Sequence, residues 1–279
     1  MVLMLDSSAP LRHLFSMSSY ETLEIVQDGP VLHVQLARVE VRNAFNGKLV
    51  EELQLFFREA DQDSTTRIVL LSGKGKSFCA GADLSWMQEQ AELPPLENER
   101  SAERMARMFL SIARCRKPVV ARIHGHALGG GTGLTAACDV ALSTEDCLFG
   151  LTEVKLGIVP AVISPFVMQK IGVGRARTLF LTGERFDGRE AQRIGLVHKA
   201  FATEAELQAA VQKCIAELLS SGPQAVANAK ELIRAVGPLT LEEAIPVTAK
   251  LIAGLRATPE AREGMGAFLG KRKPSWITG

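Results

Sequence analysis

The sequence predicts an α/β protein in which a mostly parallel sheet is followed by a helical C-terminal third. Over roughly the first half of the chain, short buried-type apolar runs alternate with segments of helical periodicity. Two loops of small residues, at 77–87 and 124–133, each stand between a predicted strand and a predicted helix. From about Gly172 the strand signals stop. Strands joined by helices in this way are typical of parallel sheets with crossover connections.

The first half begins with two strands around a tight turn. Thr22–Gln27 and Val31–Leu36 flank Asp28-Gly29-Pro30, which predicts a hairpin. Later elements alternate between helices of amphipathic spacing and short buried strands. We expect them at Lys48–Ala60 (helix), Arg67–Leu71 (strand), Glu97–Ala113 (helix), Val119–Ile123 (strand), after Gly129–Gly131 up to Ala137 (helix) and Asp139–Leu142 (strand).

The C-terminal third shows helical spacing throughout. Its six expected helices are Val173–Leu181, Arg189–Ile194, Glu204–Leu219, Gln224–Ala235, Leu241–Leu255 and Pro259–Leu269. We therefore divide the chain into three parts. Residues 1–19 form an N-terminal extension expected to be disordered, residues 20–200 an α/β core, and residues 201–279 a helical region.

The overall composition excludes several classes of function. The 279 residues contain 32 Lys and Arg against 31 Asp and Glu, a net charge of +1, so nothing in the balance recruits nucleic acid or an acidic membrane surface. No apolar run approaches the roughly 18 residues of a membrane span. Five widely spaced cysteines without a C-x-x-C pair predict reduced, buried thiols. The N-terminus lacks a secretory pattern, so we expect a cytoplasmic protein.

The loop at 124–133 contains three consecutive glycines, Gly129–Gly131, before a helix. Backbone N–H groups at a helix N-terminus lack internal partners and favour an anion or a developing oxyanion. A tight turn with close packing explains the glycines equally well. A dinucleotide fingerprint is excluded, because it needs glycine where Leu134 stands.

The loop at 77–87 carries small residues at 79–82 and a helix cap at Asp83 or Ser85. Taken alone it is more typical of structure than of function. Together with the triglycine loop, it provides N–H groups from two strand ends that can converge on one oxygen. Such a pair of donors is the usual device for stabilising an oxyanion.

Charged and imidazole side chains supply the remaining candidates. Glu153 lies among apolar neighbours, which predicts a raised pKa suited to acid/base chemistry; a solvated helix start is the alternative. His124 and His126 share one face of a strand but have no third ligand, so we expect no metal site. The run Lys271–Lys273 beside Phe268 fits either a solvated tail or a phosphorylated, base-bearing ligand.

In combination, these segments resemble the crotonase (enoyl-CoA hydratase/isomerase) superfamily, from about Tyr20 to Lys273. The resemblance is carried by Phe78–Leu84, Gly125–Gly131, Cys138-Asp139, Phe149–Pro160, Leu181–Arg185, Ala191–Val197 and Glu263–Arg272. It implies a spiral of ββα units with a helical trimerisation region, and hence a homotrimer or a dimer of trimers. It also implies an acyl-CoA ligand, with coenzyme A as part of the substrate and no permanently bound cofactor.

The resemblance also assigns roles to individual residues. It implies an oxyanion hole formed by the N–H groups of Ala80 and Gly130, with Glu153 as the acid/base. It implies CoA contacts at Arg42, Ala44, Phe78, Ala80, Gly81, Ala82, Asp83, Leu84, Gly129, Gly130, Phe268 and Lys271, of which Phe268 and Lys271 match positions that contact the adenine and phosphates.

One position departs from the family pattern. Hydratases of this superfamily usually carry a second glutamate three residues after the central glycine, where this chain has Gly133. A single glutamate is also the pattern of Δ3,Δ2-enoyl-CoA isomerases, which is the first alternative. A non-catalytic acyl-CoA-binding protein is the second.

Finer resemblance points to one branch, the bacterial methylglutaconyl-CoA hydratases of leucine degradation. It is carried by Leu84–Met87 and Pro160–Phe166. The implied reaction interconverts 3-methylglutaconyl-CoA and 3-hydroxy-3-methylglutaryl-CoA. That substrate carries its own distal carboxylate, and we expect Lys155 or His126 to hold it.

Overall fold

A six-stranded sheet forms the centre of the molecule. The computed structural model describes residues 20–277, so the extension expected at residues 1–19 lies outside the described part. The strand order is β1-β2-β3-β4-β6-β9, antiparallel between β1 and β2 and parallel elsewhere. The strands are β1 (Leu23–Asp28), β2 (Val31–Leu36), β3 (Ile68–Gly73), β4 (Val119–Ile123), β6 (Val140–Thr144) and β9 (Lys199–Phe201).

A second, smaller sheet contains the short strands β5 (His126–Leu128), β7 (Leu148–Gly150) and β8 (Arg185–Phe186). The chain passes from the large sheet to the small one within each turn, from β4 to β5 and from β6 to β7. After β3 the same step ends in a parallel bridge between Cys79 and Ala127. A helix follows each pair of strands, so the repeating unit is ββα and the predicted spiral is confirmed.

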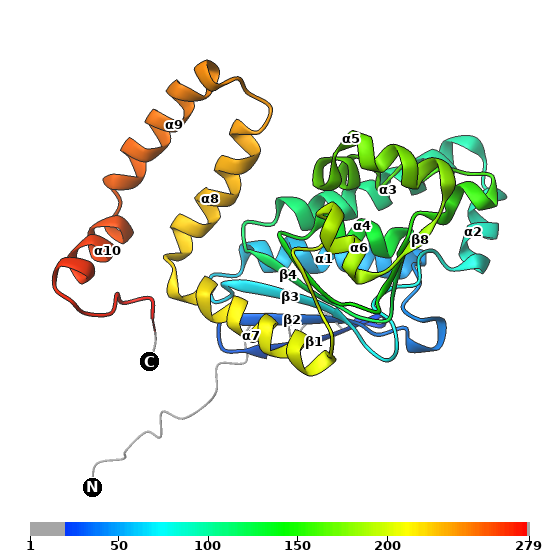
Figure 1. Cartoon of the computed structure of the whole chain (residues 1–279), viewed down its shortest axis with the longest axis horizontal. Helices are drawn as coiled ribbons and strands as arrows, with labels where there is room; N and C mark the ends of the chain where they lie inside the picture. Colours follow the sequence, from blue (N-terminus) through cyan, green and yellow to red (C-terminus); the bar gives the residue numbers. More distant parts are fainter. Residues whose placement is uncertain (1–19, 278–279) are drawn as a thin grey trace, which may run out of the picture.

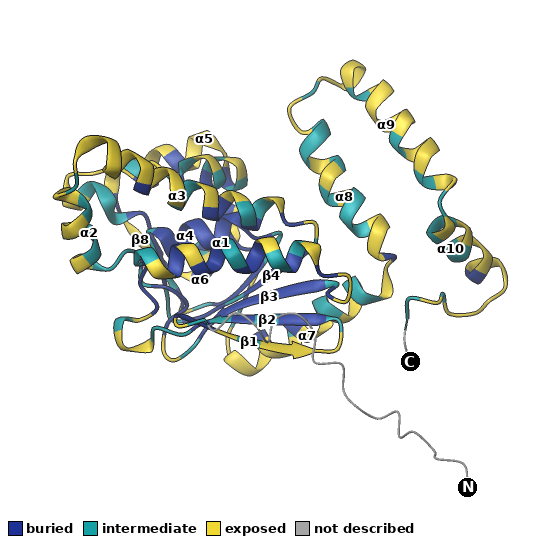
Figure 2. Cartoon of the chain, turned by 180° about the vertical axis from the view of Figure 1, so that it is seen from behind, coloured by how far each residue is buried: buried dark blue, intermediate teal, exposed yellow. Residues whose placement is uncertain are grey.

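Helices cover one face of the large sheet, as Figure 2 shows by the dark blue of their inner sides. In the core they are α1 (Gly47–Gln62), α2 (Leu84–Ala91), α3 (Pro95–Arg114), α4 (Gly130–Ala137), α5 (Ser164–Thr182) and α6 (Gly188–Ile194), with the 3-10 turns η1 (Val39–Val41) and η2 (Thr152–Leu156). The side chain of Asn46 caps α1 by accepting from the Leu49 N–H. Phe56 and Phe57 on its inner face are fully buried against the sheet.

The cysteines behave as small buried hydrophobic residues, as predicted for a reduced protein. Cys79, Cys115, Cys138 and Cys147 are buried and Cys214 is half-buried, all as free thiols. Burial raises the pKa of Cys79 to about 12. Such thiols are protonated at neutral pH and take no part in nucleophilic chemistry.

The other face of the large sheet is covered by α7 (Glu204–Ser220). Leu207 and Val211 on this helix pack with Leu70, Val120 and Leu142 in a second apolar cluster. The helical region therefore begins with an element that belongs to the packed body. The helices that follow, α8 (Pro223–Val236), α9 (Leu241–Arg256) and α10 (Pro259–Leu269), form an arm that stands away from the body (Figure 1).

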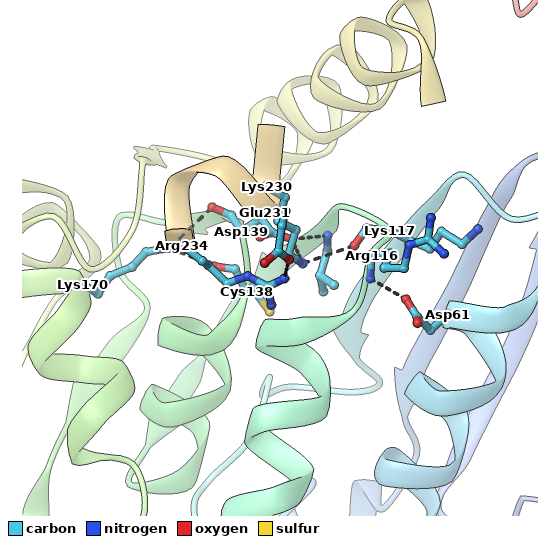
Figure 3. A network of polar contacts seen from close by, with 10 residues as sticks. Asp61, Arg116, Lys117, Cys138, Asp139, Lys170, Lys230, Glu231 and Arg234 are labelled. Atoms are coloured by element: carbon cyan, nitrogen blue, oxygen red, sulfur yellow. Dashed lines mark hydrogen bonds and ion pairs between the residues drawn. The ribbon is translucent and has the colours of Figure 1, made fainter. Parts of the chain in front are cut away.

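Two groups of polar contacts hold the arm (residues 223–277) to the body. In one, the Lys230 ammonium on α8 lies 2.6 Å from Asp139 Oδ2 and donates to the Lys117 carbonyl at 3.3 Å (Figure 3). In the other, Arg67 donates to the Trp276 carbonyl at 2.8 Å, and the Trp276 indole N–H donates to the Ser220 carbonyl at 3.0 Å. Within residues 20–277, no helix has the length and apolar character to cross a bilayer.

The structure corrects the sequence-based elements after Gly172. Strand signals were expected to stop there, yet β8 and β9 follow. Both have three residues or fewer, too few to show a period. The helix expected at Val173–Leu181 is the second half of α5, which begins at Ser164 and is interrupted at Gly172, whose φ of 78° lies outside the helical region.

Candidate active site

Backbone hydrogen bonds lock the two small-residue loops together. The Cys79 N–H donates to the His126 carbonyl at 2.9 Å, and the Leu128 N–H donates to the Cys79 carbonyl at 3.0 Å. These are bonds of a parallel pair, so both segments run toward the same edge of the small sheet. The loops that follow, at 80–84 and 129–131, therefore meet at that edge.

Two glycines allow this close meeting. Gly81 has φ +100°, and Gly129 combines φ +49° with ψ −115°; glycine adopts both conformations without strain. A Cβ atom on Gly81 would lie 3.1 Å from the Leu128 carbonyl oxygen, and one on Gly129 would lie 3.1 Å from Glu153 Oε1. The two loops and the Glu153 carboxyl are thus in mutual contact, as the sequence predicts.

At this meeting point the N–H groups of Gly81, Ala82 and Gly130 have no acceptor within residues 20–277. We take Ala82 and Gly130 as the pair of candidate donors. On either side of Ala82 the backbone is fixed, because Phe45 N–H donates to the Gly81 carbonyl at 2.7 Å and Asp83 N–H donates to the Phe45 carbonyl at 2.9 Å. Gly130 is the first residue of α4, where N–H groups lack helical partners.

The structure corrects the first predicted donor. The Ala80 N–H is not available to a ligand, since it donates to the Arg42 carbonyl at 3.0 Å. Ala82, two residues later, has an N–H group without an acceptor within residues 20–277. Ala80 borders the cavity only by its small side chain and backbone.

Glu153 has an unusual environment for a carboxyl group. It lies in the first turn of η2, which ends at Gly157 in the left-handed conformation. Its Oε2 is buried and has no hydrogen-bond partner among the described residues, and no ion pair reaches it there. Burial raises the pKa of Glu153 above its ordinary value. The sequence-based expectation of a raised pKa agrees with this.

These groups border one cavity of about 390 Å³, mostly lined by apolar side chains. Of the predicted site residues, it brings together Ala80, Gly81, Ala82, Leu84, Gly129, Gly130 and Glu153. The other lining residues are Met87, Met105, Leu128, Thr152, Leu156, Ile158, Val159, Pro160, Ala161, Val162, Ile163 and Arg185. Because Leu84, Leu156 and Val159 are exposed, the cavity is open to solvent.

Three residues expected to contact CoA instead form contacts within the protein around the loop at 80–84. Phe78 is fully buried in the main core, so its side chain cannot touch a ligand. Asp83 caps α2 through the Ser85 N–H and forms an ion pair with Arg38 at 3.0 Å. Ala44 is buried, and its carbonyl accepts from the same Arg38.

The other expected CoA contacts lie outside the cavity. Arg42 is exposed, has φ +52°, and contributes its carbonyl to the bond with Ala80. Phe268, which is 84% exposed, and Lys271 lie at the end of the arm. Figure 1 shows α10 at the opposite end of the molecule from α2, which borders the cavity. This chain does not bring its own Phe268 to Glu153.

Gly133, where a second glutamate is usual, has no room for one. It is buried in α4, and a Cβ atom there would lie 2.3 Å from Ile163 Cγ2 and 3.1 Å from Phe109 Cε1. Ile163 also lines the cavity. Apolar side chains therefore occupy the volume that an acid at position 133 would need, and Glu153 is the only carboxyl among the described residues lining the cavity.

The imidazoles are already paired with protein groups. His124 Nε2 lies 2.8 Å from the Gly75 carbonyl, and His126 Nδ1 lies 3.1 Å from Ser77 Oγ. In the described part of the chain, no three His, Cys, Asp or Glu side chains are grouped as metal ligands would be. Lys155 is exposed and lines a neighbouring cavity together with Arg185.

Sequence reasoning assigned no role to several lining residues. The segment from Leu156 to Ile163 lines the cavity. It lies within the motifs Phe149–Pro160 and Pro160–Phe166, which indicate the family and its branch but give these residues no role. Thr152 and Arg185 lie within the family motifs, but the sequence predicts no function for them. Arg185 reaches the cavity because β8 pairs with β7, opposite Gly150, and no sequence signal marks a two-residue strand.

Comparisons with known proteins agree with this geometry. The family of enoyl-CoA hydratases/isomerases matches residues 27–278. The 2,3-dehydroadipyl-CoA hydratase of Escherichia coli (strain K12) is 32% identical over 247 residues, covering 88% of this chain and 94% of that protein. The peroxisomal Δ(3,5)-Δ(2,4)-dienoyl-CoA isomerase of Arabidopsis thaliana is 32% identical over 272 residues, covering 93% of this chain and 98% of that protein.

The same similarity appears among solved structures. The crystal structure of an enoyl-CoA hydratase from Shewanella pealeana superposes with a TM-score of 0.88 at 35% identity, covering 92% of this chain and 96% of that one. The spiral fold and the relatives together identify an enzyme of the class that acts on CoA thioesters. The chain belongs to the enoyl-CoA hydratase/isomerase family, within the crotonase superfamily.

Replacing Glu153 by glutamine is expected to stabilise the protein at neutral pH. Because the folded-state pKa is raised, the stability that Glu153 contributes is present below its unfolded pKa and is lost as pH rises through the folded pKa. Glu153→Gln cannot ionise and escapes this loss. Urea unfolding across pH will show a gain that grows from acidic to neutral pH.

Glu52 provides a matched control of opposite sign. Burial alone raises its pKa, but donors from the Glu21 and Thr22 backbone and from the Thr22 hydroxyl outweigh burial and lower it. Glu52→Gln should therefore be less stable than wild type at neutral pH and approach it as pH falls through the lowered pKa. If both variants change the unfolding free energy at neutral pH in the same direction, the opposite pKa shifts of Glu153 and Glu52 are contradicted.

Adding a methyl group at position 133 is expected to overpack the helix. Gly133→Ala places a Cβ against the branched side chain of Ile163, at a cost of about 1–3 kcal/mol in unfolding free energy. Ile163→Ala leaves space at the same contact. In a double-mutant cycle the pair should be less destabilised than the sum of the single variants; additive effects would show that Ile163 does not fill the site.

Proposed function

We propose that this enzyme adds water reversibly to a 2-enoyl-CoA thioester. The observation that carries the proposal is the convergence of two unpartnered amides, at Ala82 and Gly130, with one unpaired carboxyl at Glu153 in an apolar cavity. The amides suit a thioester oxygen that gains negative charge. The carboxyl suits proton transfer close to it.

In the proposed mechanism the thioester oxygen accepts hydrogen bonds from the Ala82 and Gly130 N–H groups. This polarises the conjugated double bond toward C3. The Glu153 carboxylate takes a proton from water as the hydroxyl oxygen bonds to C3, which leaves an enolate held by the two amides. Protonated Glu153 then returns that proton to C2. One carboxyl thus serves as base and acid, which a raised pKa favours.

The preferred substrate in this proposal is 3-methylglutaconyl-CoA, giving 3-hydroxy-3-methylglutaryl-CoA. Two segments that resemble the methylglutaconyl-CoA hydratases supply cavity residues, Leu84 and Met87 from one and Pro160–Ile163 from the other. The Escherichia coli relative is named for a substrate that is also the CoA thioester of a dicarboxylic acid.

The cytoplasmic location expected from the sequence stays a prediction.

Isomerisation of an enoyl-CoA is the second candidate. The observation that favours it is the single carboxyl, since moving a double bond needs one group to take a proton at one carbon and return it at another. The relative from Arabidopsis thaliana, which is named as a Δ(3,5)-Δ(2,4)-dienoyl-CoA isomerase, supports this candidate. The two reactions differ in absorbance, because hydration removes the conjugated thioester and isomerisation of a 3-enoyl-CoA creates it.

We also propose that the arm assembles the chain into a homotrimer or a dimer of trimers. Large apolar side chains are exposed along it, namely Ile233, Leu241, Ile245, Val247, Ile252, Met265, Phe268 and Leu269. Leu241 and Ile245 lie on one face of α9, and Figure 2 shows that helix largely exposed. An apolar stripe of this kind is normally covered by another chain.

In such an assembly the CoA contacts predicted for the arm come from a neighbouring copy. Phe268 and Lys271 are exposed and belong to the arm, which lies away from the cavity of its own chain. They can therefore contact the adenine and phosphates of a ligand bound to a neighbouring copy. Arg42, exposed beside the loop at 80–84, is the predicted phosphate contact within the chain.

Glu153→Gln is expected to lower kcat for hydration of 3-methylglutaconyl-CoA by roughly 10²–10⁴-fold, the usual contribution of a general acid/base. Because the amides and the cavity remain, affinity for the product analogue 3-methylglutaryl-CoA should stay within about threefold, as judged by calorimetry. The assay follows loss of the conjugated thioester and identifies the product by mass. Undiminished turnover in this variant, or a product without added water, contradicts the proposed hydratase.

Charges on α9 are expected to dissociate the assembly. Leu241→Glu with Ile245→Glu places two carboxylates in the apolar stripe, and desolvating them would cost several kcal/mol per interface. Sedimentation velocity should show trimers or hexamers for the wild type and monomers for this variant. Lys250→Glu, on the same helix but outside the stripe, is the control. A monomeric wild type at micromolar concentration would contradict the proposed role of the arm.

A further inference from the structure

Arg185 is the one basic residue among the described residues that line the cavity of Glu153. It lies on β8, directly opposite Gly150 on β7, and Gly150 is three residues before Glu153 in the chain. A Cβ atom on Gly150 would lie 3.2 Å from Arg185 Cγ and 3.3 Å from Thr152 Cγ2. The stem of Arg185 therefore crosses the strand that leads into the catalytic turn.

The guanidinium of Arg185 has no partner within the described chain. No hydrogen bond or ion pair joins it to Glu153, Glu184 or any other side chain in residues 20–277. Arg185 is exposed, so its guanidinium is solvated in the free protein. Because it also borders a mostly apolar cavity, it is available to an anionic group on a ligand there.

The Arg185 guanidinium also does not lower the pKa of Glu153, the proposed acid. The pKa of Glu153 is raised by burial, and no basic residue lowers it. A guanidinium in close contact would hold that pKa down instead. Glu153 and Arg185 thus line the same cavity without forming an ion pair with each other.

The two cations expected from sequence fit an anion less well. His126 is bonded to Ser77 and does not line the cavity. Lys155 lines only the adjoining cavity, which it shares with Arg185, Thr152 and Leu156. Arg185 borders both cavities, so it is the basic residue that can contact a ligand extending from the cavity of Glu153 into the adjoining one.

We propose that Arg185 binds the distal carboxylate of the acyl group and makes the enzyme selective for CoA thioesters of dicarboxylic acids. This rests on the proposed hydratase function and adds to it the residue that sets the substrate class. A guanidinium can bind a carboxylate through two parallel N–H bonds, which fixes the orientation of the acyl chain as well as its charge. The substrate carboxylate then forms the ion pair with Arg185 that no described residue of the protein forms.

The test compares two substrates of equal shape. In 3,5-dimethyl-2-hexenoyl-CoA an isopropyl group stands where 3-methylglutaconyl-CoA has its carboxylate. Arg185→Met should lower kcat/KM for 3-methylglutaconyl-CoA roughly 10- to 100-fold, the usual loss of a charge-assisted hydrogen bond, and change the neutral substrate less than about twofold. Arg185→Lys should recover part of the loss. Lys155→Met tests the cation that the sequence favours for this carboxylate. If Arg185 is the binding residue, this variant should leave both substrates within about twofold.

A binding measurement separates this proposal from the reaction itself. Calorimetry with 3-methylglutaryl-CoA, which cannot be hydrated, should show a similar loss of affinity in Arg185→Met. If neither substrate is hydrated but this loss is found, the hydratase function fails and the carboxylate site stands. Equal losses on both substrates, which would place Arg185 on the CoA phosphates or in the fold, overturn the proposal. So does a wild-type enzyme without preference for the carboxylate.

Discussion

The whole site depends on one backbone contact, the parallel bridge between Cys79 and Ala127. Through its N–H and carbonyl, Cys79 bonds to the segment that leads into the triglycine loop. This fixes the spacing between the free amides of Ala82 and Gly130 before any ligand binds. Preorganised donors of this kind are effective because no reorganisation accompanies the development of charge.

Much of the fold was predictable from sequence, because the larger elements carry their own signals. The strand at Val119–Ile123 and the helix at Pro259–Leu269 have the predicted bounds. The strands of the second sheet gave no signal, since two or three residues are too few to show alternation. Those short strands nevertheless position Glu153 and Arg185, so the sequence predicts the proposed acid but not the basic residue that lines the same cavity.

The choice between Ala80 and Ala82 shows a second limit of sequence reasoning. Both are small residues in the same loop, and either offers an amide. Which amide is free is decided by the Arg42 carbonyl, almost forty residues earlier, which accepts from Ala80. At position 133 the sequence shows that an acid is absent, but only the packing of Ile163 and Phe109 shows that the space for it is filled.

The buried thiol of Cys79 has a consequence for experiments on this enzyme. It lies directly beneath the loop at 80–84, is fully enclosed and stays protonated at physiological pH. Alkylating or oxidising reagents, which act on exposed thiolates, therefore reach it only when the loop detaches from the sheet. The rate at which Cys79 is labelled thus measures local opening of the loop, independently of turnover.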